Sequence, residues 1–262
     1  MNNDPHSQRS AVLGKVPELT FMFWVIKIAA TTLGETAGDA VTMSMHLGYL
    51  VGTAIFLAVF VAAVAAQIRA GRFHPALFWC VIVATTTAGT TLADFFDRSL
   101  NIGYAGGATV LALLLTGSLL WWYCALGTVA INRIVTRKGE MFYWMTIMFS
   151  QTLGTALGDW FADPDAGLGL GYQGSAVVFG AALVVIAAAY FWTRVSRTGL
   201  FWPAFIVTRP LGATVGDFLD KPVANGGLAL SRYSASAALA VFIVACILLV
   251  RQRAERIAPE PV

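Results

Sequence analysis

The sequence predicts an all-α fold, a polytopic membrane helix bundle whose eight transmembrane helices form four tandem helical hairpins with parallel-topology pseudo-symmetry. Composition is the first reason, because 58% of the residues are hydrophobic and only 12% are charged, whereas soluble domains carry about 25% charged residues. The second is that the apolar residues form long blocks, which approach the roughly 20 residues that a spanning helix needs. The third is a pattern that recurs four times along the 262 residues.

Each copy of this pattern contains a tryptophan, a glycine and an aspartate at fixed spacing. The glycine follows the tryptophan by ten residues, and the aspartate follows the glycine by five. The glycine-to-aspartate segments are residues 34–39, 89–94, 154–159 and 212–217, and the tryptophans are Trp24, Trp79, Trp144 and Trp202. Because a fixed recurring pattern identifies the unit of folding, we interpret the chain as four copies of one two-helix unit.

The eight expected helices follow from the apolar blocks and from the turn and basic residues between them. We place them at residues 19–38, 48–67, 75–94, 107–130, 140–159, 174–193, 199–218 and 233–250. The repeats then cover approximately residues 15–72, 73–138, 139–197 and 198–253, in a single membrane domain over residues 1–262 with tails at 1–14 and 254–262. Each tryptophan falls near one membrane surface, where tryptophan is typical of an interfacial anchor.

Lysine and arginine are distributed unequally between the two ends of these helices. Twelve lie in the tails and in the connections after even-numbered helices, whereas only Arg98, Lys221 and Arg232 lie in the other connections. Cytoplasmic loops carry the excess of basic residues, so we expect both termini in the cytoplasm and the aspartates at the outer surface. Residues 1–13 lack the features of a cleaved signal peptide, and we expect the first helix to be retained.

The carboxylates of the pattern suggest a cation site. Eight of the nine aspartates lie at or just beyond the outer ends of odd-numbered helices. Carboxylates are costly at membrane depth unless they pair, line water or bind a cation, and Mg²⁺ and Mn²⁺ prefer oxygen ligands. The expected metal ligands are Glu35, Asp39, Asp94, Asp159 and Asp217, and the hydroxyls expected along a transport pathway are those of Thr36, Thr91 and Thr214. Two plainer interpretations stay open: the aspartates are solvated turn residues, and the threonines serve helix packing.

Two basic residues inside the expected helices make the copies unequal. Lys27 lies in the first helix and Arg209 in the seventh, and we assign both to the pathway. The position of Arg209 is polar in the other copies too, where it is held by Thr31, Thr86 and Gln151. We expect Arg209 to pair with Glu35 or an aspartate, either to tune a carboxylate or as a static buried ion pair.

No motif indicates an enzyme. The sequence has no nucleophile elbow, Walker loop, histidine-rich metal cluster or Ser-His-Asp set, and the last helix lacks the lysine that a retinal photoreceptor needs. We expect no cofactor beyond a transported cation. The net charge of +3 does not imply nucleic acid, because the basic residues gather on one side of the membrane. The expected partners are the lipid bilayer and a cation substrate, and a homo-oligomer stays open.

Three segments carry a resemblance to a known family. They are Lys-Val-Pro-Glu-Leu-Thr at 15–20, Thr-Thr-Ala-Gly-Thr-Thr-Leu-Ala-Asp at 86–94 and Arg-Pro-Leu-Gly-Ala-Thr-Val-Gly-Asp at 209–217. With the fourfold pattern they resemble a bacterial family of uncharacterised, membrane-anchored proteins made of four tandem two-helix repeats of unknown function. The resemblance implies a bacterial inner membrane location and this architecture, and it supplies no activity. The first copy departs from the others because it lacks a second aspartate, present as Asp97, Asp163 and Asp220.

The carboxylate pattern therefore favours an inner-membrane cation transporter, with export of a divalent metal such as Mn²⁺ as the particular hypothesis. The alternative is a non-transporting structural or partner-binding membrane protein, in which the aspartates only shape the outer surface. The sequence leaves the ion, the direction of transport and its energy coupling open.

Overall fold

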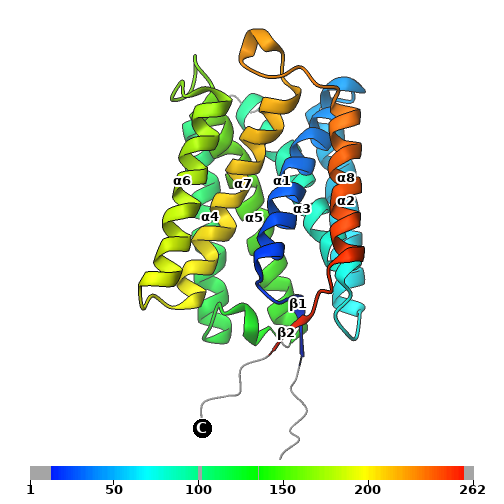
Figure 1. Ribbon diagram of the computed structural model, residues 1–262, viewed down its shortest axis with the longest axis vertical. Coiled ribbons are helices and arrows are strands. Elements are labelled where there is room, and N and C mark those ends of the chain that lie inside the picture. Colours follow the sequence, from blue (N-terminus) through cyan, green and yellow to red (C-terminus); the bar gives the residue numbers. More distant parts are fainter. Residues whose placement is uncertain (1–12, 100–101, 135, 257–262) are drawn as a thin grey trace, which may run out of the picture.

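The computed structural model describes residues 13–99, 102–134 and 136–256, and its long helices stand side by side in one bundle (Figure 1). Within these residues the eight long helices are α1 (Phe21–Asp39), α2 (Gly48–Arg69), α3 (Pro75–Asp94), α4 (Gly103–Leu126), α5 (Arg137–Ala162), α6 (Gly171–Trp192), α7 (Arg197–Asp220) and α8 (Arg232–Leu249). The all-helical expectation is confirmed. The largest difference is at α4, which begins at Gly103 instead of residue 107 because Gly103 adopts a positive φ of 69° and turns the chain directly into the helix.

Short elements join and close the bundle. The π-helical turns η1 (Ala40–Ser44) and η2 (Phe95–Ser99) follow α1 and α3, and the 3₁₀ turns η3 (Ile131–Arg133) and η4 (Val223–Asn225) lie in later connections. Two strands were not expected: β1 (Leu13–Pro17) pairs antiparallel with β2 (Ala254–Arg256) at the end of the bundle where the basic connections lie. We call this the basic end, and the opposite end, where Asp39 and Asp94 terminate their helices, the acidic end.

The odd-numbered helices begin at the basic end with local start signals. Hydroxyl side chains cap three of them, since Thr20, Thr136 and Ser196 accept a hydrogen bond from the backbone N–H three residues later. Such caps satisfy an N–H that has no partner inside the helix. Helix α3 instead begins with Pro75, whose fixed φ suits the first turn.

The eight helices form two layers. The odd-numbered helices make an inner ring in which α1 packs on α3, α3 on α5, α5 on α7 and α7 on α1. The even-numbered helices form an outer layer, with α2 against α3, α4 against α5, α6 against α7 and α8 against α1. Each outer helix therefore packs mainly on the inner helix of the next repeat, and α8 closes the circle.

The expected pairing of the helices into four hairpins is not confirmed, because most helices pack more closely on a neighbouring repeat than on the other helix of their own. At the acidic end the π-helical turns η1 and η2 follow α1 and α3, whereas residues 70–74 and 193–196 join α2 to α3 and α6 to α7 directly. In these two cases the short connection places antiparallel helices side by side. The repeat is thus a unit of sequence, whereas the helices that pack most closely on each other belong to neighbouring repeats.

The recurring glycine sets the spacing of the inner ring. A Cβ atom built on Gly34 would lie 2.5 Å from Thr86 Cγ2, and one on Gly89 would lie 2.9 Å from Gln151 Cβ. The same contact joins each glycine to the polar position of the following repeat, as Gly34 with Thr86, Gly89 with Gln151, Gly154 with Arg209 and Gly212 with Thr31. Small residues allow helix backbones to approach closely in membranes. Four equivalent contacts therefore give the ring its pseudo-fourfold symmetry.

The outer layer presents apolar side chains away from the protein. Five helices of the described residues, α2, α3, α4, α6 and α8, are long and apolar enough to cross a membrane. Most of the side chains in the apolar stretch of α3 are buried, whereas few are in α2, α4, α6 and α8. Exposed apolar surface on this scale marks contact with a partner or with lipid, as expected for a membrane protein.

Contrary to the expectation from the sequence, the tryptophans of the pattern are not interfacial anchors. The exposed fractions of Trp79, Trp144 and Trp202 are 1%, 2% and 6%, and Trp24 is partly buried. The indole of Trp79 donates a 2.7 Å hydrogen bond to Gln252 Oε1, and that of Trp202 donates a 3.1 Å bond to the carbonyl of Val129. The expectation was wrong because Trp24, Trp79 and Trp144 pack against aromatic rings of neighbouring inner helices, and Trp202 packs against Trp122 of α4. They pack as an aromatic layer across the basic end of the ring.

Gly34→Ala is expected to destabilise the protein by about 1–3 kcal/mol, because the added methyl group collides with Thr86 where the inner helices meet. Gly117→Ala on α4 is the matched control: no atom lies within 4 Å of its Cβ position, and alanine favours the helix by about 0.5–1 kcal/mol. Thermal unfolding of both purified variants in detergent measures the difference. Equal melting temperatures would contradict the proposed spacing.

Candidate functional site

Equivalent positions of the four inner helices form layers along the middle of the ring. The layer nearest the basic end is aromatic and buried, and consists of Phe23, Phe78, Tyr143 and Phe201. The next buried layer is Lys27, Ile82, Ile147 and Phe205, followed by Thr31, Thr86, Gln151 and Arg209. Beyond the glycines lie Glu35, Thr90 and Thr155 with Ala213, and then Asp39, Asp94, Asp159 and Asp217 at the acidic end. The interior thus changes from aromatic to polar to acidic.

Arg209 crosses the ring and contacts three other inner helices. Its Nη2 donates to Glu35 Oε2 at 3.0 Å and to the hydroxyls of Thr90 and Thr155, both at 2.5 Å. Arg209 and Glu35 are almost fully buried. Of the two pairings expected for Arg209, the structure contains the one with Glu35. This side chain separates the acidic layer from the rest of the interior.

Lys27 lies one layer closer to the basic end and is fully buried. Its Nζ atom is 3.4 Å from Thr208 Oγ1 and 4.1 Å from the centre of the Phe205 ring. A cation over an aromatic face is attracted by the electrons of the ring. Lys27 is therefore part of the ring interior, but it does not join the carboxylates.

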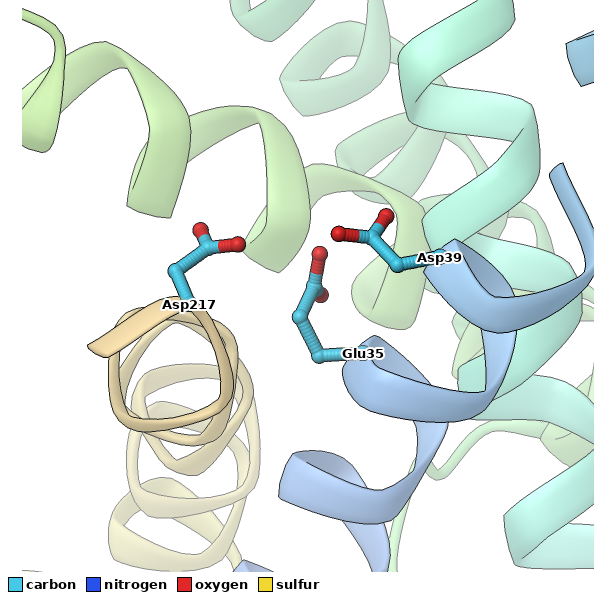
Figure 2. Close-up of side chains that lie close together, drawn as sticks. All are labelled: Glu35, Asp39 and Asp217. Atoms are coloured by element: carbon cyan, nitrogen blue, oxygen red, sulfur yellow. The ribbon is translucent and has the colours of Figure 1, made fainter. Parts of the chain in front are cut away.

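Three carboxylates converge at the acidic end (Figure 2). Glu35 and Asp39 lie one turn apart on α1, Asp217 approaches from α7, and one carboxylate oxygen of each lies within 4.8 Å of the others. All three are buried. This convergence depends on ring closure, because α7 and α1 belong to the last and first repeats. We call Glu35, Asp39 and Asp217 the carboxylate triad.

Basic residues of the fourth repeat lie beside the triad. The Nζ of Lys221 contacts Asp39 Oδ2 through a short bond and lies 3.1 Å from Asp217 Oδ1. The Nε of Arg232 lies 3.2 Å from Asp220 Oδ2 and 3.8 Å from Asp39 Oδ2. The fourth repeat therefore supplies both a carboxylate of the triad and the cations that balance it.

The carboxylates at this end shift the pKa of Lys221, the first residue after α7. Burial lowers the pKa of Lys221, but attraction to Asp217, Asp39 and Asp220 outweighs it and holds the pKa well above the ordinary value. Lys221 therefore stays a cation at neutral pH.

The remaining predicted carboxylates lie apart from the triad. Asp94 is buried at the end of α3 and does not belong to the group of three. Asp159 lines a cavity of about 400 Å³ at the acidic end, together with Asp217 and Lys221. Tyr104 and Tyr172 also border this cavity. The expected single site of five carboxylates is thus a triad with one further aspartate near its entrance.

The predicted pathway threonines do not face the triad. Thr36 Oγ1 donates to the carbonyl of Leu33 and accepts a 2.8 Å bond from Ser236 of α8. Thr91 and Thr214 donate to carbonyls of their own helices. The hydroxyls that reach the interior belong to the preceding position of each repeat, at Thr90 and Thr155. The signal that identifies them is Glu35, which occupies that same position in the first repeat.

Several buried polar atoms of the ring interior lack a hydrogen-bond partner among the described residues. They include Asp39 Oδ1, the Nε and Nη1 atoms of Arg209, and both amide atoms of Gln151. A buried polar group without a partner costs about 1–3 kcal/mol. These atoms therefore offer hydrogen-bond donors and acceptors to water or to a bound ligand.

Comparison with known proteins places the chain in a family. The model described as Repeat of Unknown Function (DUF347) matches four times, at residues 22–73, 77–128, 142–196 and 200–255. The chain belongs to this family. One match falls on each of the four repeats, which confirms the repeat family that the sequence resembles. No curated protein and no solved structure matches the chain. The function is therefore inferred from the geometry and chemistry of the site residues.

Arg209→Met is expected to lower the free energy of unfolding by about 3–5 kcal/mol, because it leaves Glu35 buried without its cation. The double variant Arg209→Met with Glu35→Gln should recover most of this loss, since no uncompensated charge then remains. Thermal unfolding in detergent measures both. A double variant as unstable as Arg209→Met alone would show that the ion pair is not the source of the effect.

Proposed function

We propose that this protein is a cation transporter of the bacterial inner membrane, which binds a divalent metal ion such as Mn²⁺ at the carboxylate triad and exports it. All eight long helices cross the membrane in this proposal. The basic end, with both chain ends, faces the cytoplasm, because basic residues concentrate on that side of the membrane. The acidic end faces outward.

The convergence of Glu35, Asp39 and Asp217 is the observation that carries this proposal. Three buried oxygen ligands from two helices fit a hard divalent cation, which prefers carboxylate oxygen and water. Intramembrane acidic groups are expensive and mark ion pathways. The triad also has access to the acidic end, since Asp217 lines the cavity of about 400 Å³.

The layers below the triad support an outward-facing, inward-closed arrangement. Arg209 closes the ring immediately beneath Glu35, and the aromatic layer that includes Phe23 and Tyr143 fills the basic end. A transporter must expose its site to one side at a time, commonly by moving one group of helices against another. The contacts of Arg209 with Thr90 and Thr155 are therefore the ones that must break for the site to open inward.

One observation favours the alternative of a non-transporting structural protein. Glu35 is paired with Arg209, and Asp39 and Asp217 are paired with Lys221. In that alternative, these ion pairs only hold the first and last repeats together. The two functions differ in ion flux: a transporter moves ions across the membrane, whereas a structural ion pair does not.

Asp217→Asn is expected to reduce Mn²⁺ efflux at least about tenfold, because it removes a charged ligand from the triad. The measurement is Mn²⁺ release from loaded bacterial cells that produce each variant at equal membrane levels. Glu18→Gln is the control, since Glu18 is exposed at the basic end, away from the triad and its cavity, and should leave efflux unchanged. Unchanged efflux in Asp217→Asn, in a correctly inserted protein, would support the structural alternative.

A further inference from the structure

We infer that the ammonium group of Lys221 is a tethered competitor of the transported cation, which occupies the triad when no metal is bound and leaves it when a divalent ion enters. This inference rests on the proposed function and names a further residue of the same site. It gives Lys221 a role that differs from that of Arg209, which stays with Glu35.

The contacts of Lys221 place its charge where a bound cation would be. Its Nζ lies between carboxylates of α1 and α7, in contact with Asp39 Oδ2 and 3.1 Å from Asp217 Oδ1. Both aspartates are almost fully buried, and Asp39 Oδ1 has no hydrogen-bond partner among the described residues. The ammonium therefore satisfies only part of the oxygen set, and a metal ion with more ligand positions can use the remaining oxygen.

The balance of charge favours a divalent ion as the replacement. The ionised triad carries three negative charges, of which Arg209 neutralises one and Lys221 another, while Arg232 is balanced by Asp220. When Lys221 leaves, two negative charges remain. A divalent ion then restores neutrality to this buried group, whereas a monovalent ion leaves one charge uncompensated, which is costly in a medium of low dielectric constant.

A cavity beside the triad can hold the ammonium group of Lys221 after a metal ion displaces it. It is the first residue after α7 and borders the cavity of about 400 Å³ that also contains Asp159 and Asn225. A lysine carries its charge on a flexible four-carbon stem, so the ammonium can move into this cavity without movement of the helices. Asp159 offers it a carboxylate there.

Only the fourth repeat supplies this lysine. The residue four positions after the aspartate is Met43 in the first repeat, Arg98 in the second, Asp163 in the third and Lys221 in the fourth. Met43 lies against the same ammonium, with its Sδ 3.9 Å from Nζ. The triad is thus bounded by the two ends of the repeat array, where the copies differ most in charge.

The test is Mn²⁺ binding to the purified full-length protein in detergent, measured by the loss of the free Mn²⁺ electron paramagnetic resonance signal. Lys221→Met should bind Mn²⁺ at least about tenfold more tightly than the unchanged protein, because the competing charge is gone. Lys221→Arg should keep the weaker affinity. Lys138→Met, which removes an exposed lysine at the basic end, should leave the affinity unchanged.

A small ammonium compound that replaces the lost side chain distinguishes a competing charge from a merely structural role of Lys221. Propylammonium added to Lys221→Ala should compete with Mn²⁺ and weaken its binding, whereas it should not affect the unchanged protein, whose site already holds an ammonium. Equal or weaker Mn²⁺ affinity in Lys221→Met, with a normal melting temperature, would overturn the inference.

Failure of this inference can be distinguished from failure of the proposed function. If Lys221→Met binds Mn²⁺ more tightly but cells show no Mn²⁺ efflux, the triad is a cation site held by Lys221 and the transport proposal is wrong. If efflux depends on Asp217 but the Lys221 variants bind Mn²⁺ like the unchanged protein, the transport proposal stands and Lys221 is not a competitor.

Discussion

Close contact between the inner helices at the recurring glycines is the constraint on which the rest of the structure depends. Each glycine brings its helix against the polar position of the next repeat, and the contact of Gly212 with Thr31 joins the last repeat to the first. A larger residue would hold the helices apart. Because the ring closes in this way, Glu35 and Asp39 of α1 meet Asp217 of α7, although they are far apart in sequence.

The same closure concentrates the differences between the repeats in one place. The second and third repeats contribute the hydroxyls of Thr90 and Thr155 to the layer that contains Glu35 of the first repeat. The fourth contributes Arg209, which reaches Glu35 from the neighbouring layer. A symmetric scaffold therefore holds an asymmetric arrangement of charge, in which the first and fourth repeats carry the groups that can bind and balance a cation.

Much of the fold could be predicted from the sequence, and the site only in part. The apolar blocks predicted the helices, and the Trp-Gly-Asp spacing predicted the repeat and the acidic end, because these features depend on local composition and on sequence period. The packing partner of each helix could not be predicted, since adjacent positions such as Thr90 and Thr91 both lie on a plausible inner face and only the crossing of the helices selects between them. Lys221 was missed because it lies in a connection, whose path depends on the helices that it joins.

Cross-linking of α8 to α1 tests closure of the ring most directly. Thr36 Oγ1 and Ser236 Oγ are 2.8 Å apart, so Thr36→Cys with Ser236→Cys, in a chain whose three native cysteines are replaced by alanine, places two thiols within disulfide distance. After mild oxidation of membranes, mass spectrometry should find the two peptides joined within a single chain. Failure to form this disulfide, or its formation only between separate chains, would contradict a ring that closes the fourth repeat on the first.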